Sequence, residues 1–163
     1  MGIKSKLKHT ISFLLHGEAK PIYASIHYLA PNEHLKGKKI VITGGGRGLG
    51  FAMAKKFVSE GAKVLIAGRN EQTLKQSASE INCLYLPLDV QDTTSFKEFI
   101  DKADQMLGGL NCLVNNAGIS LHEEGFLAVS PQQFDSQVDT NLKGCFFLTQ
   151  TFIEKCNETH VEG

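Results

Sequence analysis

Residues 40–50 of the chain read Ile-Val-Ile-Thr-Gly-Gly-Gly-Arg-Gly-Leu-Gly. The continuous β-branched run at residues 40–42 is typical of a strand that is buried on both faces of a sheet. Gly44, Gly48 and Gly50 then allow a sharp reversal, close approach of a phosphate to the backbone, and tight packing of a helix on the strand. That helix presents unpaired N–H groups and the positive end of its dipole. The stretch therefore predicts a dinucleotide pyrophosphate site.

Strand-like and helix-like segments alternate from this turn toward the C-terminus. Apolar residues at helical spacing predict a helix that ends near Gly61. Further strands are expected at residues 63–67, 84–88 and 110–114, and further helices after Asn70, Thr94 and Ser130-Pro131, the last running with interruptions toward Cys156. Such alternation implies right-handed crossovers and a parallel sheet. We therefore predict an α/β fold with a doubly wound, Rossmann-like sheet.

A polar, basic stretch at residues 35–39 divides the chain into two parts. Residues 1–36 form an N-terminal extension that we expect to be partly helical, and residues 37–163 form the nucleotide-binding domain. The extension carries apolar residues at helical spacing and several lysines, so it suits either a membrane surface or a helix packed on the domain or a neighbouring subunit. Breaks at Gly17 and Pro21 favour the packed helix.

Composition excludes several classes of function. The chain has 163 residues, 42% of them hydrophobic, and its 17 basic residues balance 17 acidic ones, so charge gives no reason to expect a nucleic-acid partner. No apolar run approaches the roughly 20 residues of a membrane span. The cysteines show neither Cys-x-x-Cys nor metal-ligand spacing, which favours free thiols in the cytoplasm and no metal site: Cys83, Cys112, Cys145 and Cys156.

Several spaced motifs resemble the short-chain dehydrogenase/reductase family over residues 37–156. They are Thr43-Gly44-x-x-x-Gly48-x-Gly50, the run Asn115-Asn116-Ala117-Gly118, and Asn141 in a later helix. The resemblance implies that the cofactor pyrophosphate and ribose lie on the turn formed by Thr43, Gly44, Gly45, Gly46, Arg47, Gly48, Leu49 and Gly50. It also implies that the adenine is bordered by Asp89 and Val90, and that the cofactor is lined by Asn116, Ala117 and Gly118. Taken singly, these residues also suit ordinary turns, and Asp89 suits a helix cap.

The choice of cofactor follows from charge. Sites selective for NAD carry a carboxylate at the end of the second strand, about 20 residues beyond the glycine turn, which accepts from the ribose 2′-hydroxyl. Gly68 stands at that place here, Arg69 follows it, and Arg47 lies inside the turn. Two guanidinium groups suit a 2′-phosphate, so we expect NADP(H) to be preferred over NAD(H). The alternative for Arg69 is a solvated surface arginine.

The resemblance further implies hydride transfer between nicotinamide and a carbonyl or alcohol carbon. In the family a serine, a tyrosine and a lysine do the acid–base chemistry, and a helix asparagine, matched by Asn141, holds a water in the proton relay. No Tyr-x-x-x-Lys occurs here, because the tyrosines are followed four residues on by other residues: Tyr23 by His27, Tyr28 by Asn32 and Tyr85 by Asp89.

We therefore expect a chain truncated before these residues, inactive alone, from an NADP(H)-dependent oxidoreductase similar to 3-oxoacyl-carrier-protein reductases or to alcohol and sugar dehydrogenases. Its partners would be a small carbonyl or alcohol substrate and further copies of the full-length chain. The alternatives are a non-catalytic nucleotide-binding or sensing module and a decayed gene product. Truncation would also leave residues 110–114 as an exposed apolar edge strand and remove neighbours from Phe146, Phe147 and Phe152.

Overall fold

A parallel sheet of four strands is the centre of the computed structural model, which describes residues 30, 32–120 and 125–159. The strands are β1 (Lys39–Thr43), β2 (Lys63–Gly68), β3 (Leu84–Pro87) and β4 (Cys112–Val114). Their order is β3-β2-β1-β4, and every pairing is parallel. The predicted α/β, Rossmann-like class is confirmed. The helix expected in the N-terminal extension lies outside the described residues.

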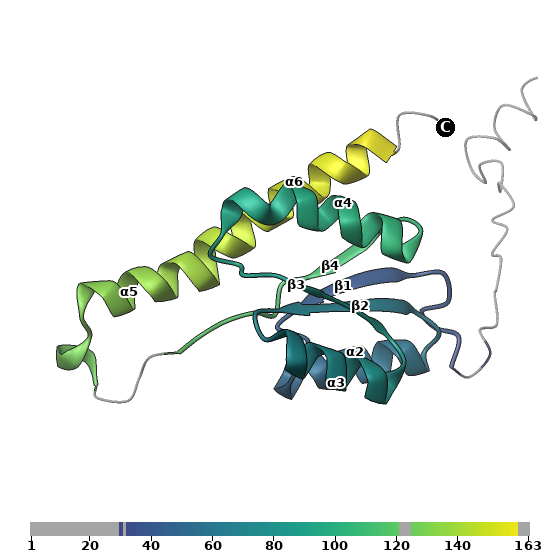
Figure 1. The fold of residues 1–163 in the computed structure, drawn as a ribbon, viewed down its shortest axis with the longest axis horizontal. Helices are drawn as coiled ribbons and strands as arrows, with labels where there is room; N and C mark the ends of the chain where they lie inside the picture. Colours follow the sequence, from purple (N-terminus) through teal and green to yellow (C-terminus); the bar gives the residue numbers. More distant parts are fainter. Residues whose placement is uncertain (1–29, 31, 121–124, 160–163) are drawn as a thin grey trace, which may run out of the picture.

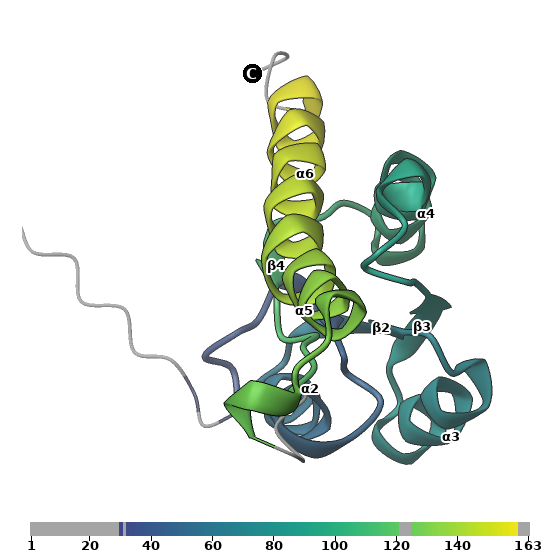
Figure 2. The same cartoon turned by 90° about the vertical axis from the view of Figure 1, so that its left-hand side faces the viewer.

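Helices cover both faces of the sheet (Figure 1). One face carries α2 (Gly48–Ser59) and α3 (Glu71–Ile81), and the other carries α4 (Phe96–Leu107) and α6 (Cys145–Thr159). Figure 2 shows α4 and α6 side by side above the strands. The remaining elements are short: η1 (Thr93–Ser95), η2 (Phe126–Ala128), α5 (Pro131–Val138) and the π-helix η3 (Asp139–Gly144), which joins α5 to α6.

Alternate residues of the central strands enter two separate cores. Ile40 and Ile42 pack with α2 and α3, whereas Val41 packs with Leu65, α4 and Leu148 of α6. All three residues of the β1 run are at most 3% exposed. This two-sided burial is the physical reason for the continuous β-branched run, because a strand with one solvated face alternates apolar and polar residues.

Local signals place the helix starts where the sequence predicts them. The Asn70 side chain accepts a hydrogen bond from the Thr73 amide, at 2.8 Å, and caps α3. Ser130 and Gln133 form a reciprocal capping box at the start of α5, with Pro131 in the first turn. Strand ends are less well predicted: β3 stops at Pro87 and β4 starts at Cys112.

The segment before β1 is anchored on the C-terminal end of α2. The Glu60 carboxylate lies 2.6 Å from His34 Nδ1 and 2.5 Å from Lys56 Nζ, and the Glu60 carbonyl accepts from the Leu35 amide. Hydrogen bonds from Lys56 and then His34 lower the pKa of Glu60 to about 2. Packing onto the domain therefore begins ahead of the predicted boundary at residue 37.

The sheet edge at β4 and the outer side of α6 are open in the described part of the chain. β4 pairs with β1 alone, as the sequence predicts for an edge strand. Phe146 and Phe147 are 63% and 42% exposed, in line with the expected loss of neighbours. Phe152 differs from that expectation, because it packs against the core formed by α4 and the sheet.

Two leucine substitutions test how the C-terminal helical segment is held. Leu148 is 0% exposed, and we expect Leu148→Ala to lower the free energy of unfolding by about 2–5 kcal/mol, because it leaves a cavity between α6 and α4. Leu142 is 65% exposed, so the matched Leu142→Ala should change it by less than about 0.5 kcal/mol. Urea denaturation at low protein concentration measures both, and equal losses would contradict this packing.

Candidate cofactor-binding site

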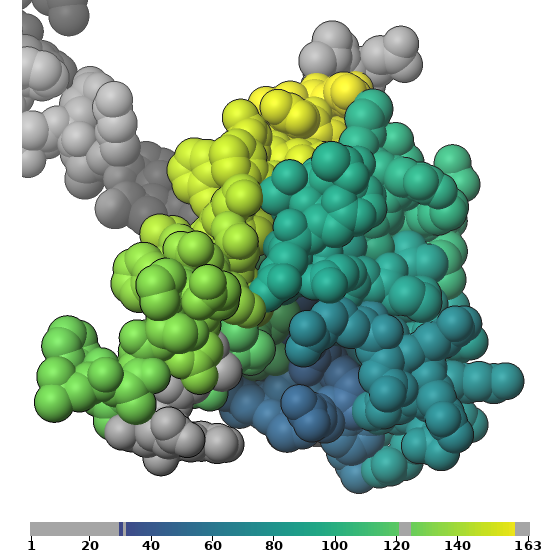
Figure 3. Space-filling model, turned by 60° about the vertical axis from the view of Figure 1, so that its left-hand side comes forward, coloured from purple at the N-terminus to yellow at the C-terminus, as the bar shows by residue number. Residues whose placement is uncertain are grey.

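A cavity of about 560 Å³ opens where the parallel strands end. Figure 3 shows the hollow between the blue N-terminal part of the domain, the teal segments and the green C-terminal arm. The cavity wall comes from the turn after β1, the ends of β2 and β3, the loop after β4 and η3. It includes all the residues predicted for the cofactor except Gly45: Thr43, Gly44, Gly46, Arg47, Gly48, Leu49, Gly50, Arg69, Asp89, Val90, Asn116, Ala117 and Gly118.

Glycine is needed at different positions of the turn for different structural reasons. Gly44 and Gly48 have φ of 66° and 55°, in the left-handed region that favours glycine. A Cβ on Gly50 would overlap the Gly44 carbonyl and the Asn116 side chain, so Gly50 lets α2 start close to the strand. Gly45 has another role: its Cα faces Ile66 of β2, where an added Cβ would lie 2.7 Å from that side chain. The turn is thus fitted to the sheet on one side and to the cavity on the other.

The start of α2 is open toward the cavity. Arg47 occupies the N-cap position with extended backbone, and in the described part of the chain no side chain caps this helix. Gly48 and Leu49, in its first turn, line the cavity. The N–H groups of a first helical turn lack intrahelical partners, so they are available to an anion.

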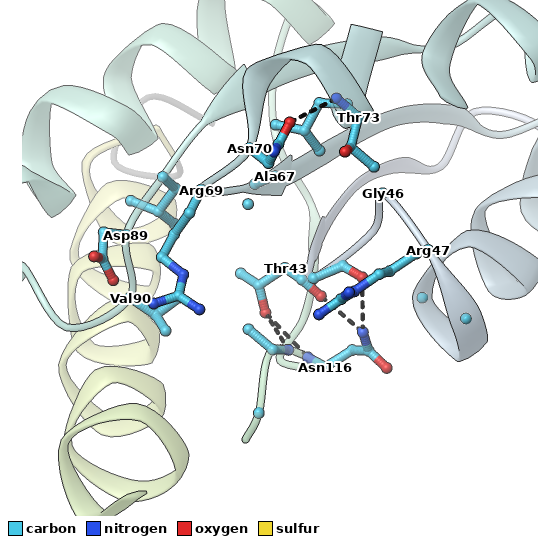
Figure 4. A pocket seen from close by; sticks show the side chains of 18 of the residues that line it. Thr43, Gly46, Arg47, Ala67, Arg69, Asn70, Thr73, Asp89, Val90 and Asn116 are labelled. Carbon is cyan, nitrogen blue, oxygen red and sulfur yellow. Dashed lines mark hydrogen bonds between the residues drawn. The ribbon is translucent and has the colours of Figure 1, made fainter. Parts of the chain in front are cut away.

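Hydrogen bonds between Thr43 and Asn116 join the glycine turn to the loop after β4 (Figure 4). The Thr43 hydroxyl accepts from the amides of Asn116 and Ala117, both at 3.0 Å, and donates to the Val114 carbonyl at 3.4 Å. The Asn116 side-chain amide donates to the carbonyls of Thr43, at 2.9 Å, and Gly44, at 3.3 Å. Asn116 therefore does more than form a simple turn, because it fixes two walls of the cavity relative to each other.

Positive charge dominates the cavity wall. The guanidinium groups of Arg47 and Arg69 extend into the cavity from opposite sides (Figure 4), and neither forms an ion pair with another described residue. Gly68 leaves the end of β2 without a side chain, and Asp89 is the one carboxylate on the described wall. Two cations against one carboxylate favour an anionic ligand.

Asn141 lies behind the cavity wall and does not line it. Its side-chain oxygen accepts from the Ile119 amide at 2.9 Å, and its nitrogen donates to the Ile119 carbonyl at 2.8 Å. Asn141 belongs to η3, whose Thr140 does line the cavity. The Asn141 side chain thus holds the backbone of Ile119, which does line the cavity.

The sequence identifies Gly68 only as the place of an absent carboxylate, and it assigns no cofactor role to the remaining residues of the wall. These are Ala67, Asn70, Thr73, Leu74, Leu88, Ile119 and Thr140. A signal existed for most of them, because they directly follow or flank the carboxyl ends of parallel strands, where ligands bind in such sheets. Ser77 gave no such signal: its hydroxyl donates to the Gly46 carbonyl at 2.7 Å and holds the glycine turn from α3.

The described residues include no group of three histidine, cysteine or acidic residues that could hold a metal ion. The four cysteines are free thiols, and burial raises the pKa of Cys83 to about 11, which disfavours a reactive thiolate there. None of the described helices is both long enough and apolar enough to span a membrane.

A parallel sheet with a glycine-rich turn between β1 and α2 defines the class of Rossmann-like α/β proteins. Within this class, the family model described as short chain dehydrogenase matches residues 38–161. The chain therefore belongs to the short-chain dehydrogenase family.

Relatives in this family are oxidoreductases of several kinds. The chain is 34% identical over 123 residues to a 3alpha-hydroxysteroid dehydrogenase of Mediterraneibacter gnavus, a match that covers 71% of this chain and 49% of that protein. It is 41% identical over 117 residues to a 2,5-dichloro-2,5-cyclohexadiene-1,4-diol dehydrogenase of Sphingobium indicum, covering 69% and 46%. It is 32% identical over 127 residues to an NADP-dependent (R)-specific alcohol dehydrogenase of Lentilactobacillus kefiri, covering 76% and 50%. The chain spans about half the length of these relatives.

Solved structures agree with the family. A 3-ketoacyl-(acyl-carrier-protein) reductase from Brucella melitensis, complexed with NADH, superimposes with a TM-score of 0.72 at 34% identity. The match covers 77% of this chain and 52% of that one. A putative short-chain alcohol dehydrogenase from Sinorhizobium meliloti gives a TM-score of 0.70 at 30% identity, covering 78% and 52%.

The Thr43 hydroxyl offers a direct test of how the site is built. Thr43 is 2% exposed, so Thr43→Val would leave the amides of Asn116 and Ala117 without their acceptor, at a cost of about 1–3 kcal/mol for each unsatisfied group. We expect Thr43→Ser, which keeps the hydroxyl, to retain most of the stability. Urea denaturation of the two variants measures the difference. A valine variant as stable as the serine variant would show that the hydroxyl does not hold these loops together.

Proposed function

We propose that the cavity binds a nicotinamide dinucleotide. The observation that carries the proposal is the uncapped start of α2 beside a glycine turn that faces the cavity. The pyrophosphate and the adjoining ribose would lie on residues 43–50, where backbone N–H groups and the helix dipole favour negative charge. Asp89 and Val90 would border the adenine, with the Asp89 carboxylate accepting from its amino group. Asn116, Ala117 and Gly118 would line the path of the cofactor.

We further propose that NADP(H) is preferred over NAD(H). Support comes from Arg47 and Arg69, which reach into the cavity, and from Gly68, which occupies the place of an NAD-selective carboxylate. Glu71 is the nearest acid in sequence, but it lies in the first turn of α3, where a carboxylate stabilises the helix dipole. An NADP-dependent relative fits this preference, whereas the Brucella reductase was solved with NADH.

Replacing Arg69 tests the preference. A charged hydrogen bond contributes about 1.5–3 kcal/mol, so the chain should bind NADPH at least about tenfold more tightly than NADH. Arg69→Asp should reverse this order by repelling the 2′-phosphate and accepting from a 2′-hydroxyl. The matched change Lys75→Asp, on an exposed residue of α3 outside the cavity wall, should leave the ratio unchanged. Nucleotide fluorescence titration measures both affinities, and tighter binding of NADH by the unmodified chain would refute the role of Arg69.

The reaction that we propose for the whole protein is hydride transfer between the nicotinamide and a carbonyl or alcohol carbon. The bound cofactor would supply the hydride. Membership of the family supports this class of reaction. The names of the relatives indicate alcohol, steroid and 3-ketoacyl-(acyl-carrier-protein) substrates. We propose that the whole protein is similar in activity to a 3-oxoacyl-carrier-protein reductase or to a related alcohol dehydrogenase. Asn141 would contribute by holding the wall at Ile119 and by holding a water of the proton relay.

The 163 residues contain no Tyr-x-x-x-Lys to supply the proton. We therefore expect a purified polypeptide of these residues to bind NADPH without reducing a carbonyl, and we propose that it corresponds to the cofactor-binding part of the enzyme. The measurement is NADPH oxidation followed by absorbance with a panel of ketones and 3-oxoacyl thioesters. Turnover above the uncatalysed rate would contradict the expectation. Binding without turnover in every natural form of the protein would instead favour a nucleotide-sensing module or a decayed gene product.

We also propose a cytoplasmic location and self-association of the full-length protein. Four free thiols suit a reducing compartment. Large apolar side chains are exposed along the outer side of the C-terminal arm, which suits a subunit contact: Phe134, Leu142, Phe146, Phe147 and Ile153. The partners would then be a small-molecule substrate and a second copy of the protein.

A further inference from the structure

Gln91, which the sequence did not single out, connects the loop after β3 to the C-terminal helical arm. Its side-chain nitrogen lies 2.7 Å from Thr140 Oγ1, 3.1 Å from Ser136 Oγ and 3.3 Å from the Ser136 carbonyl. Its backbone N–H donates to the Asp89 carboxylate at 3.0 Å. One residue thus orients Asp89 on the cavity wall and holds α5 and η3 at the same time.

The element that Gln91 holds is a π-helix. The backbone hydrogen bonds of η3 join residues five positions apart, instead of four as in an α-helix. This geometry is rare and occurs mostly as short segments within α-helices. The buried Thr140 hydroxyl donates to the Ser136 carbonyl at 2.8 Å while it accepts from Gln91. At the other end of η3, a Cβ on Gly144 would overlap the Val90 carbonyl, so the arm touches the same loop a second time.

The contacts continue from η3 to the opposite wall of the cavity. Asn141 follows Thr140 directly and holds both polar groups of the Ile119 backbone. Asp89, Thr140 and Ile119 all line the cavity. A continuous set of hydrogen bonds and covalent neighbours therefore runs from Asp89 through Gln91, Thr140 and Asn141 to Ile119.

We propose that Gln91 is a positioning residue. It holds η3, which carries Asn141, against the cavity, and it couples η3 to the part of the cavity wall that contains Asp89. The coupling rests on the proposed cofactor site, whereas the positioning does not require a ligand. The carboxamide contacts Thr140 in η3 and Ser136 in α5 at the same time, so a fixed 89–91 loop restrains the junction between these two elements. A ligand that contacts Asp89 would then stabilise the Ile119 wall without touching it.

Amide hydrogen exchange in the ligand-free chain tests the positioning. Gln91→Met keeps the length of the side chain but removes the donor, and we expect the Ile119 amide and residues 139–144 to exchange about threefold to tenfold faster, the factor given by loss of one hydrogen bond. Gln105→Met, on an exposed face of α4, is the matched control and should leave these rates unchanged. Thr140→Val removes the acceptor of the same bond and should give the same result if the Gln91 variant folds poorly. Unchanged rates in both variants would overturn the proposal.

A half-ligand tests the coupling. Adenosine 2′,5′-bisphosphate carries the adenine and the 2′-phosphate but no nicotinamide, so it can occupy only the adenosine end. In the unmodified chain, saturation should slow exchange at residues 44–50 and at Ile119. In Gln91→Met it should still slow residues 44–50, whereas the slowing at Ile119 is lost. Retained slowing at Ile119 in the variant would refute the coupling. No slowing anywhere in the unmodified chain would refute the cofactor site, and the ligand-free rates would still decide the positioning.

Discussion

The Thr43 hydroxyl and the Asn116 carboxamide hold together the two loops on which the cavity depends. Residues 44–47 and 115–118 lie outside helices and strands, and both segments must leave the sheet in fixed directions for the cavity to exist. Thr43 satisfies two amides of the loop after β4, while Asn116 satisfies two carbonyls of the glycine turn. Because Thr43 is buried, these bonds cannot be replaced by water without cost. The turn can then be rich in glycine and still be well defined.

Burial of β1 on both faces explains why the cavity lies at the end of the strand. With α2 and α3 packed on one face of the sheet and α4 and α6 on the other, backbone polar groups and side chains can meet a ligand at the carboxyl ends of the strands. Gly50 lets α2 begin almost in contact with β1, so the open end of this helix faces the cavity. Arg47 and Arg69 add positive charge to the same space. Packing, backbone geometry and charge therefore favour one kind of ligand, an anionic nucleotide.

The fold and most of the cavity wall could be predicted because their signals are local. Two-sided burial leaves a continuous apolar run, caps such as Asn70 and Ser130 are single residues, and the ends of parallel strands collect ligand-facing side chains. The rest depends on contacts between distant segments. The Gln91 side chain contacts Thr140, which lies 49 positions further along the chain. The π-helix that contains Thr140 has no sequence pattern of its own. For the same reason, Asn141 could be matched to a family residue while its place behind Ile119 could not be foreseen.

Backbone amide chemical shifts of the isotope-labelled chain, recorded by NMR during titration with NADPH, test most directly whether the cavity at the ends of the strands binds a nicotinamide dinucleotide. We expect saturable shifts at residues 43–50, at Arg69, at Asp89 and Val90, and at residues 116–119, with little change on the exposed faces of α4 and α6. Shifts confined to those outer faces, or none at millimolar NADPH, would contradict binding in this cavity.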